Sequence, residues 1–182
     1  SFFTGVTEGS IGSARIIKML NLKDEQLVVD EKGIYSIENF LIARRLMYWQ
    51  VYLHKTCITY ETMLISTLLR AKKLAQNGVT VFASPSLSYF LQNDIDHDQF
   101  FDGAESINHF VRLDDNDIWT SLKVWCSHED KILSLLSSGM VNRRLFKTEI
   151  DFHPFESQQI EDLQQRISQT LHISFEDAKY FI

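Results

Sequence analysis

The chain has 182 residues, 45% of them apolar and 23% charged, which is enough to bury a sizeable core and is ordinary for a soluble globular protein. Its net charge of −6 excludes a general nucleic-acid binder, because such proteins present a basic surface to the phosphate backbone. Only 7 glycines and 2 prolines favour long helices with few tight turns.

Cysteine usage and the absence of targeting signals favour a cytoplasmic protein. Cys57 and Cys126 lie in apolar stretches with a helical pattern, which is typical of reduced core residues rather than of a disulfide framework. The sequence has no apolar run of about 18 residues and no signal peptide, so we expect no membrane partner. Because Phe2 and Phe3 would be exposed at a free terminus, we expect the chain to be an internal piece of a longer protein.

The first third of the chain predicts a helix, a small hairpin and a second, longer helix. Residues 8–20 carry apolar side chains at helical spacing. Residues 26–30 and 33–36 are β-prone, and the residues between them predict a hairpin turn. The longer helix is expected to begin near Ser36.

A polar stripe follows this second helix, for which we expect residues 39–55 to be continuous. Arg44, Tyr48, Tyr52 and Lys55 are spaced by four, four and three residues, so they fall on one face of an α-helix. A guanidinium, two phenols and an ammonium in a row suit a polyanion with an attached sugar or base. A solvated face of a buried helix explains the same residue types.

A third, central helix is expected over residues 58–74, since it is apolar over a broad face and ends at Asn77-Gly78, where a left-handed conformation is tolerated. Ser84-Pro85 predicts the start of another helix through Leu91.

An acidic segment, residues 94–105, places carboxylates at positions 1, 3, 5, 9 and 12 of a calcium-loop template. Gln99 stands where the template needs glycine, so we expect an acidic surface loop without metal. His97-Asp98 matches a dipeptide of metal phosphohydrolases by coincidence, because the nearest preceding histidine, His54, lies 43 residues earlier.

The last third predicts short helices followed by a change of character. Residues 113–117 are a helix-start signal, with carboxylates at the positive end of the helix dipole. Further helices are expected over 129–136, 142–147 and 156–170, and an extended piece over 150–154. We therefore predict one helical domain over 1–147 and the start of a small α+β subdomain over 148–182.

The expected fold is mainly α, with a small β-hairpin and a short α+β appendage at the C-terminal end. No glycine-rich phosphate loop, nucleophile elbow or cysteine–histidine pairing is visible, so no catalytic residue is assigned within this chain.

Five ordered blocks, at residues 1–6, 13–18, 43–56, 113–118 and 143–147, resemble the HD-domain deoxynucleoside triphosphate triphosphohydrolases. The resemblance implies the helical part of an HD-type phosphohydrolase. It implies a divalent metal whose ligands all lie upstream of this chain, which itself holds none. The implied reaction is attack of water on the triphosphate, releasing inorganic triphosphate and a nucleoside.

The same resemblance assigns binding residues. By motif alignment, Arg44 contacts the triphosphate and Tyr52 the sugar of a nucleoside triphosphate, while Tyr48 stands where another family member carries histidine. A phenol still donates a hydrogen bond to phosphate. A second, regulatory nucleotide site between subunits is implied for six residues: Arg15, Lys32, His54, Lys55, Arg143 and Lys147. Asp30 replaces one arginine of that site, and its charge opposes an anion.

The resemblance also implies a homo-oligomer. The competing hypothesis is a non-catalytic helical module whose long helix docks a protein partner, because arginine and aromatic residues anchor interfaces as often as they bind phosphate.

Overall fold

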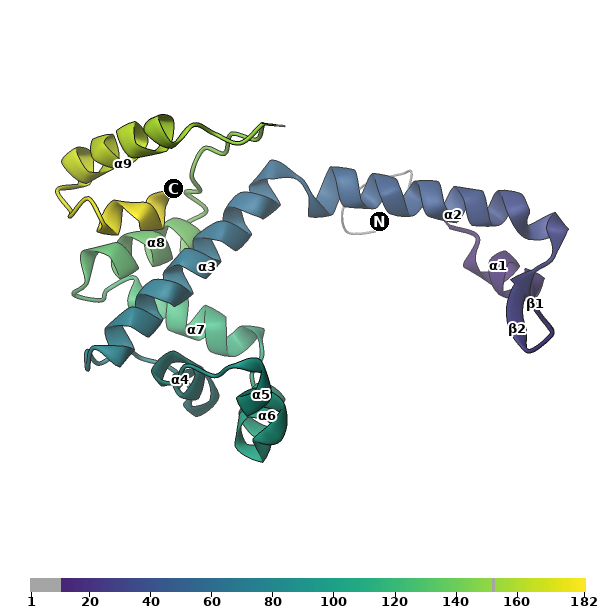
Figure 1. Ribbon diagram of the computed structural model, residues 1–182, viewed down its shortest axis with the longest axis horizontal. Helices are drawn as coiled ribbons and strands as arrows, with labels where there is room; N and C mark the ends of the chain where they lie inside the picture. The colour runs from purple at the N-terminus through teal and green to yellow at the C-terminus, as the bar shows by residue number, and fades with distance from the viewer. Residues whose placement is uncertain (1–10, 152) are drawn as a thin grey trace. The chain divides into compact units, whose positions relative to one another are not determined.

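The computed structural model describes residues 11–151 and 153–182. Its described residues are mainly helical, with one small antiparallel hairpin, which confirms the predicted fold class (Figure 1). The chain divides into two compact units, Ser1–Ile58 and Thr59–Ile182, and each is described by itself. The expected domains 1–147 and 148–182 stay a prediction.

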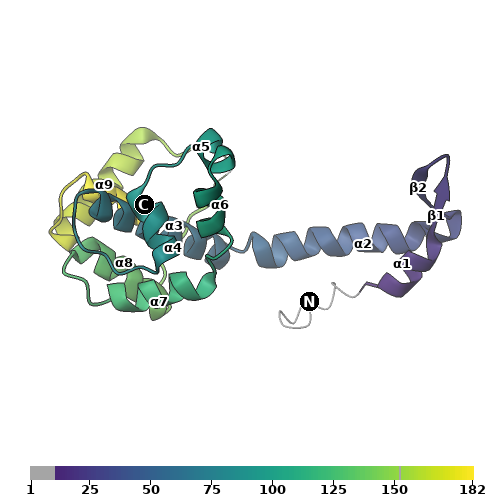
Figure 2. The same ribbon diagram turned by 90° about the horizontal axis from the view of Figure 1, so that it is seen from below.

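The first unit holds a short helix, the hairpin and a long helix. The elements in order are α1 (Ser13–Met19), β1 (Leu20–Lys23), β2 (Gln26–Val29), the 3-10 turn η2 (Glu31–Gly33) and α2 (Ile34–Met47). Both α1 and η2 contact α2, so the start of the long helix is held by the segment before it (Figures 1 and 2).

The hairpin is real, but its predicted partner strand is wrong. β2 pairs with β1, Leu22 opposite Leu27, and not with residues 33–36. The turn is Asp24-Glu25, and both residues have positive φ (52° and 61°), which matches the twist of a two-residue hairpin. Gly33 instead ends η2, and Ile34 begins α2. The absence of a side chain at Gly33 accommodates the close approach of Met19 and Val29.

The predicted continuous helix over 39–55 is also corrected. α2 ends at Met47 and continues as a π-helical turn, Tyr48–Tyr52. The Leu53 amide donates to the Tyr48 carbonyl at 2.7 Å, five residues back, which is the π-helical pattern. A new helix, α3 (Lys55–Gln76), follows. A hydrophobic period near 3.6 does not distinguish one wider turn, so the sequence pattern missed it.

The second unit is organised around α3, as its apolar pattern predicted. The part of α3 in this unit buries Met63, Thr67, Arg70 and Ala71. Around it pack α4 (Pro85–Gln92), α7 (Asp115–Trp125) and α8 (Lys131–Val141) (Figure 2). The shared core consists of Met63, Ala71, Leu87, Leu91, Leu122, Trp125, Leu133 and Met140.

Local signals set the ends of these helices. Ser84 accepts a hydrogen bond from the Leu87 amide and begins α4, while Asp114 forms a capping box with Asp117 at the start of α7. Gly78, at φ 79°, follows the end of α3, and the Val79 amide donates to the Leu74 carbonyl. These three predicted boundaries are confirmed.

The acidic segment and residues 142–147 differ from expectation. Instead of a loop, the segment contains α5 (His97–Asp102), followed by α6 (Ala104–Phe110). Asp96 and Gln99 form a capping box there, so a carboxylate of the calcium template starts a helix. Residues 142–147 are not helical: α8 ends at Val141, and Arg143 adopts a left-handed φ of 56°.

The C-terminal stretch contains the predicted helix, α9 (Ser157–Leu171), and a 3-10 turn, η4 (Asp177–Phe181). A second small core joins Ile132 and Leu136 of α8 to Tyr180 of η4. The expected extended piece at 150–154 has no regular structure in its described residues. Cys57 and Cys126 are free and half-buried. Among the described residues, no helix is both long and apolar enough to cross a membrane.

Candidate functional site

Arg44, Tyr48 and Tyr52 form one continuous stack along α2 and the π-helical turn. The Arg44 guanidinium carbon lies 5.7 Å from the centre of the Tyr48 ring, within cation–π range. The Tyr48 and Tyr52 ring centroids are 5.1 Å apart, edge to face. All three side chains are exposed, with Tyr48 at 46% and Tyr52 at 55%. The sequence spacing therefore predicted a real juxtaposition of a permanent cation and two phenols.

Lys55 does not continue this stack on the same helix. It is the first residue of α3, beyond the π-helical turn and the two residues that follow it. His54 lies at this break, where its Nδ1 accepts a hydrogen bond from the Thr56 amide at 3.2 Å. That bond makes Nδ1 an acceptor and leaves Nε2 to carry the proton of the neutral ring.

The six cations expected at a second nucleotide site are all exposed side chains. Four of them belong to the first unit: Arg15 on α1, Lys32 on η2, His54 and Lys55. Asp30, whose negative charge opposes theirs, follows β2. Its backbone N–H donates a hydrogen bond to the Met19 carbonyl at 2.9 Å. The first unit thus carries most of the predicted cationic set.

Arg143 and Lys147 belong to the second unit. Burial raises the pKa of the Tyr60 phenol, and the positive charge of Arg143 partly offsets this. Tyr60 is therefore protonated at neutral pH, and its hydroxyl has no hydrogen-bond partner among the described residues. Lys147 pairs with Glu149 at 3.0 Å on the surface, a contact that an anionic ligand has to displace.

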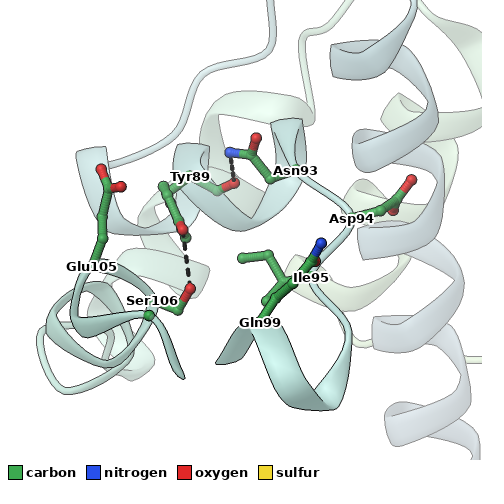
Figure 3. Close-up of a pocket in the computed structure, with 8 residues that line it drawn as sticks. Tyr89, Asn93, Asp94, Ile95, Gln99, Glu105 and Ser106 are labelled. Atoms are coloured by element: carbon green, nitrogen blue, oxygen red, sulfur yellow. Dashed lines mark hydrogen bonds between the residues drawn. The ribbon is translucent and has the colours of Figure 1, made fainter. Parts of the chain in front are cut away.

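A cavity of about 290 Å³ lies in the second unit, and the residues that line it do not include a predicted site residue (Figure 3). The Tyr89 hydroxyl and the Ser106 Oγ are 3.0 Å apart at its wall. Asp94 and Glu105 also line it. Hydrogen bonds from Lys72 and Gln76 lower the pKa of Asp94. The negative charges of the Asp94 and Glu105 carboxylates repel phosphate, so this cavity does not suit a nucleoside triphosphate.

The described residues do not fit a divalent metal. Nowhere in residues 11–151 and 153–182 do three histidine, cysteine, aspartate or glutamate side chains come together as a metal ion needs. No catalytic step through a metal is therefore derived from these residues.

Sequence reasoning missed the buried ion network around Arg70. Its Nε and Nη2 donate to both oxygens of Asp130, at 3.1 and 2.6 Å, and its Nη1 donates to Asp177 at 2.8 Å. Tyr180 lies under the guanidinium at 5.4 Å. In the sequence, Arg70 is the single charged residue on the apolar face of α3 that begins with Met63 and Thr67. Its two partners, however, lie 60 and 107 residues further along the chain. The network joins α3, α8 and η4.

Comparison with known families matches residues 11–96 to the model described as the HD associated region. This stretch includes the Arg44 stack and the first four of the predicted cations.

The similar proteins include two curated relatives and one solved structure. YwfO of Bacillus subtilis is 31% identical over 156 residues, which cover 86% of this chain and 34% of that protein. The MG461 homolog of Mycoplasma pneumoniae is 29% identical, covering 100% of this chain and 42% of that protein. A crystal structure described as a phosphohydrolase from Bacteroides thetaiotaomicron superposes with a TM-score of 0.95 at 61% identity, over 99% of this chain and 45% of that one.

The chain thus spans less than half the length of each of these proteins. The chain is therefore similar to part of a protein described as a phosphohydrolase, and its residues 11–96 match the HD associated region.

Proposed function

We propose that this chain is the ligand-holding helical part of an HD-type phosphohydrolase that acts on nucleoside triphosphates. The observation that carries the proposal is the exposed Arg44–Tyr48–Tyr52 stack, which lies within the matched HD associated region. It offers a fixed positive charge beside two phenol donors, the chemistry that a triphosphate with a sugar attached requires.

Each residue of the stack has a distinct role in this proposal. The Arg44 guanidinium presents several parallel donors and a positive charge, so it holds phosphate oxygens and offsets the charge that develops on them during hydrolysis. Tyr52 donates to a sugar hydroxyl or packs its ring against the sugar. Tyr48, between them, holds the Arg44 guanidinium over its ring and thereby orients it.

The π-helical turn supports a binding role for this segment. A single wider turn in an α-helix is energetically poorer than the regular form and occurs frequently at functional sites. Here it contains both tyrosines of the stack, Tyr48 and Tyr52. The backbone of both tyrosines therefore departs from regular α geometry. Both lie just before Leu53 and His54, the two residues that separate the π-helical turn from α3.

From the resemblance, we propose that a divalent metal is held by residues of the whole protein outside this chain. Among the described residues, no group of side chains fits one. The metal would polarise the phosphate and supply hydroxide to it. The residues described here bind and orient the substrate. We accordingly assign catalysis to the whole protein and none to this chain alone.

The second nucleotide site is retained as part of the proposal. Its support is the exposure of all six side chains that the resemblance assigns to it. Substituting Lys32 and Lys55 together by alanine is expected to remove nucleotide activation while leaving hydrolysis at saturating substrate unchanged. Activation that survives this double substitution removes the site from the proposal.

The direct test compares Arg44→Ala with wild type in the whole protein, using Arg166→Ala on α9 as the matched control. A charge-assisted contact to phosphate is worth about 1.5–3 kcal/mol, so binding of a non-hydrolysable nucleoside triphosphate should weaken by roughly 10-fold to 100-fold. Inorganic triphosphate should show the same loss, and a nucleoside without phosphate should show none.

The Arg166→Ala variant should bind like wild type, because that side chain is exposed on a different unit. Unchanged triphosphate binding in Arg44→Ala removes the assignment of that residue. Failure of the wild-type protein, supplied with divalent metal, to bind or hydrolyse any nucleoside triphosphate overturns the proposed function itself.

A further inference from the structure

The short helices α5 and α6 lie side by side in the second unit and expose a row of aromatic rings (Figure 1). Phe101 on α5 is 63% exposed, and Phe110 at the end of α6 is 57% exposed. The Phe100 ring lies between them, because its centroid is 5.3 Å from that of Phe101 and 5.4 Å from that of Phe110. We name these three rings, with the exposed Ile107 and Val111, the aromatic face.

Contacts on the opposite side of α6 hold this face toward solvent. The Ser106 Oγ and the hydroxyl of Tyr89 on α4 are 3.0 Å apart, and Ser106 is buried (Figure 3). The His109 ring stacks on Tyr89 with centroids 4.3 Å apart. The three apolar residues that α6 contributes to the aromatic face are spaced by three and four positions, so they share the other side of the helix. A contiguous apolar surface that the fold holds in water marks an interaction site.

The sequence around the aromatic face is strongly acidic. Residues 94–117 contain eight carboxylates, one arginine and no lysine, a net charge of −7, whereas the whole chain has −6. The negative charge of the chain is therefore concentrated in this stretch, and the remainder is almost neutral. Among the described residues, only Asp94 of these carboxylates pairs with a lysine or arginine. The exposed carboxylates without such a pair are Asp96, Asp98, Glu105, Asp114 and Asp115.

This combination selects the chemistry of a partner. A nucleic acid, an anionic lipid surface or an acidic peptide is repelled by the carboxylates. A segment that places apolar side chains on one face and lysine or arginine beside them satisfies both the rings and the charges. The rest of this chain has almost no net charge to offer, so the complementary positive charge comes from another polypeptide.

We propose that the aromatic face of α5 and α6 docks a basic amphipathic segment of a partner protein. The apolar side chains of that segment pack on Phe101 and Phe110, which supply most of the affinity. Its lysines or arginines pair with the surrounding carboxylates, which speed association and exclude acidic competitors. The aromatic face shares no residue with the Arg44 stack, so the inference goes beyond the proposed function and does not depend on it.

The test measures fluorescence polarisation of labelled probe peptides mixed with the whole protein. The first probe is an amphipathic, helix-forming peptide of leucine and lysine. The second replaces every lysine by glutamate, and the third replaces every leucine by serine. The wild-type protein should bind the first probe about tenfold more tightly than either of the others, and its preference for lysine should shrink as salt is raised.

Phe101→Ser combined with Phe110→Ser removes both anchors and should weaken binding of the first probe by about tenfold or more. The matched control combines Phe155→Ser with Ile160→Ser, which removes two exposed apolar side chains elsewhere in the second unit. The control variant should bind the probe like wild type.

Asp98→Asn combined with Glu105→Gln keeps the rings and removes two exposed charges. This variant should bind the first probe about threefold more weakly at low salt and like wild type at high salt, because exposed ion pairs are weak and screened.

Equal binding of the lysine and glutamate probes, or an anchor variant that binds like wild type, overturns the proposal. A wild-type protein that binds no probe overturns it as well, and further measurements then identify what covers the face. If the rest of the polypeptide covers it, the anchor variant unfolds at a lower temperature than the control variant. If a second copy covers it, sedimentation shows lost self-association in the anchor variant. Nucleoside triphosphate binding by the anchor variant should equal that of wild type, which separates failure of this inference from failure of the proposed function.

Discussion

Replacing Arg70 by alanine should be among the most destabilising single changes in the second unit. The side chain is 11% exposed, and it makes three charge-assisted hydrogen bonds to carboxylates that are themselves 16% and 25% exposed. Its removal leaves Asp130 and Asp177 with partly buried charges and no guanidinium. Removing one partner of a buried ion pair costs about 3–5 kcal/mol. Since Asp177 keeps some contact with water, we expect Arg70→Ala to lower the free energy of unfolding by the lower end of this range, about 3 kcal/mol.

Urea unfolding followed by circular dichroism measures this loss, and the thermal midpoint should fall by roughly 6–12 °C. Asp177→Asn serves as the graded control, because it removes the charge from the most exposed of the three groups and should cost about 1 kcal/mol. Arg70→Lys should fall between the two, since a single ammonium does not span both carboxylates as the fork does. A loss below about 1 kcal/mol for Arg70→Ala would show that the network contributes little and would refute this reasoning.

Two further predictions follow from the same unit. Burial alone would raise the pKa of Asp130, but hydrogen bonds from Arg70 and the Leu133 amide, with the Arg70 charge, hold it below its usual range. The stabilisation by the Asp130 carboxylate is therefore fully present above its unfolded pKa of about 3.9 and is lost as pH falls through its lower folded pKa. The free energy of unfolding should consequently fall less steeply with acid in Arg70→Ala than in wild type. Parallel curves of unfolding free energy against pH for the two proteins would contradict this. Gly78→Ala should cost about 1–2 kcal/mol because φ is 79° there, although an added methyl meets nothing within 4 Å. Gly78→Asn should cost less, since asparagine tolerates the left-handed region, and equal losses in urea would exclude a backbone origin.

Local signals were sufficient wherever neighbouring residues decide the structure. The Ser84 and Asp114 caps, the glycine after α3 and the amphipathic α9 follow from hydrogen bonds or periods that span a few residues. The Arg44–Tyr48–Tyr52 stack was predictable for the same reason, because four-residue spacing brings side chains together on one helix face.

The misassigned elements have identifiable physical causes. Leu20–Lys23 continues the apolar pattern of α1, so its change into a strand depended on pairing with Gln26–Val29 and not on its own composition. Residues 142–147 have helical composition, yet the chain turns at Arg143 through a left-handed conformation that residue types alone do not require.

The sequence by itself determined the helical character of this protein, several of its helix boundaries and the residues of its candidate ligand stack, since all of these depend on short-range spacing. Tertiary structure decided what spacing cannot. It joined Arg70 to carboxylates 60 and 107 residues away and separated Lys55 from the stack by a π-helical turn. These contacts depend on which segments far apart in the chain meet in the folded protein, and short-range sequence patterns do not specify those segments.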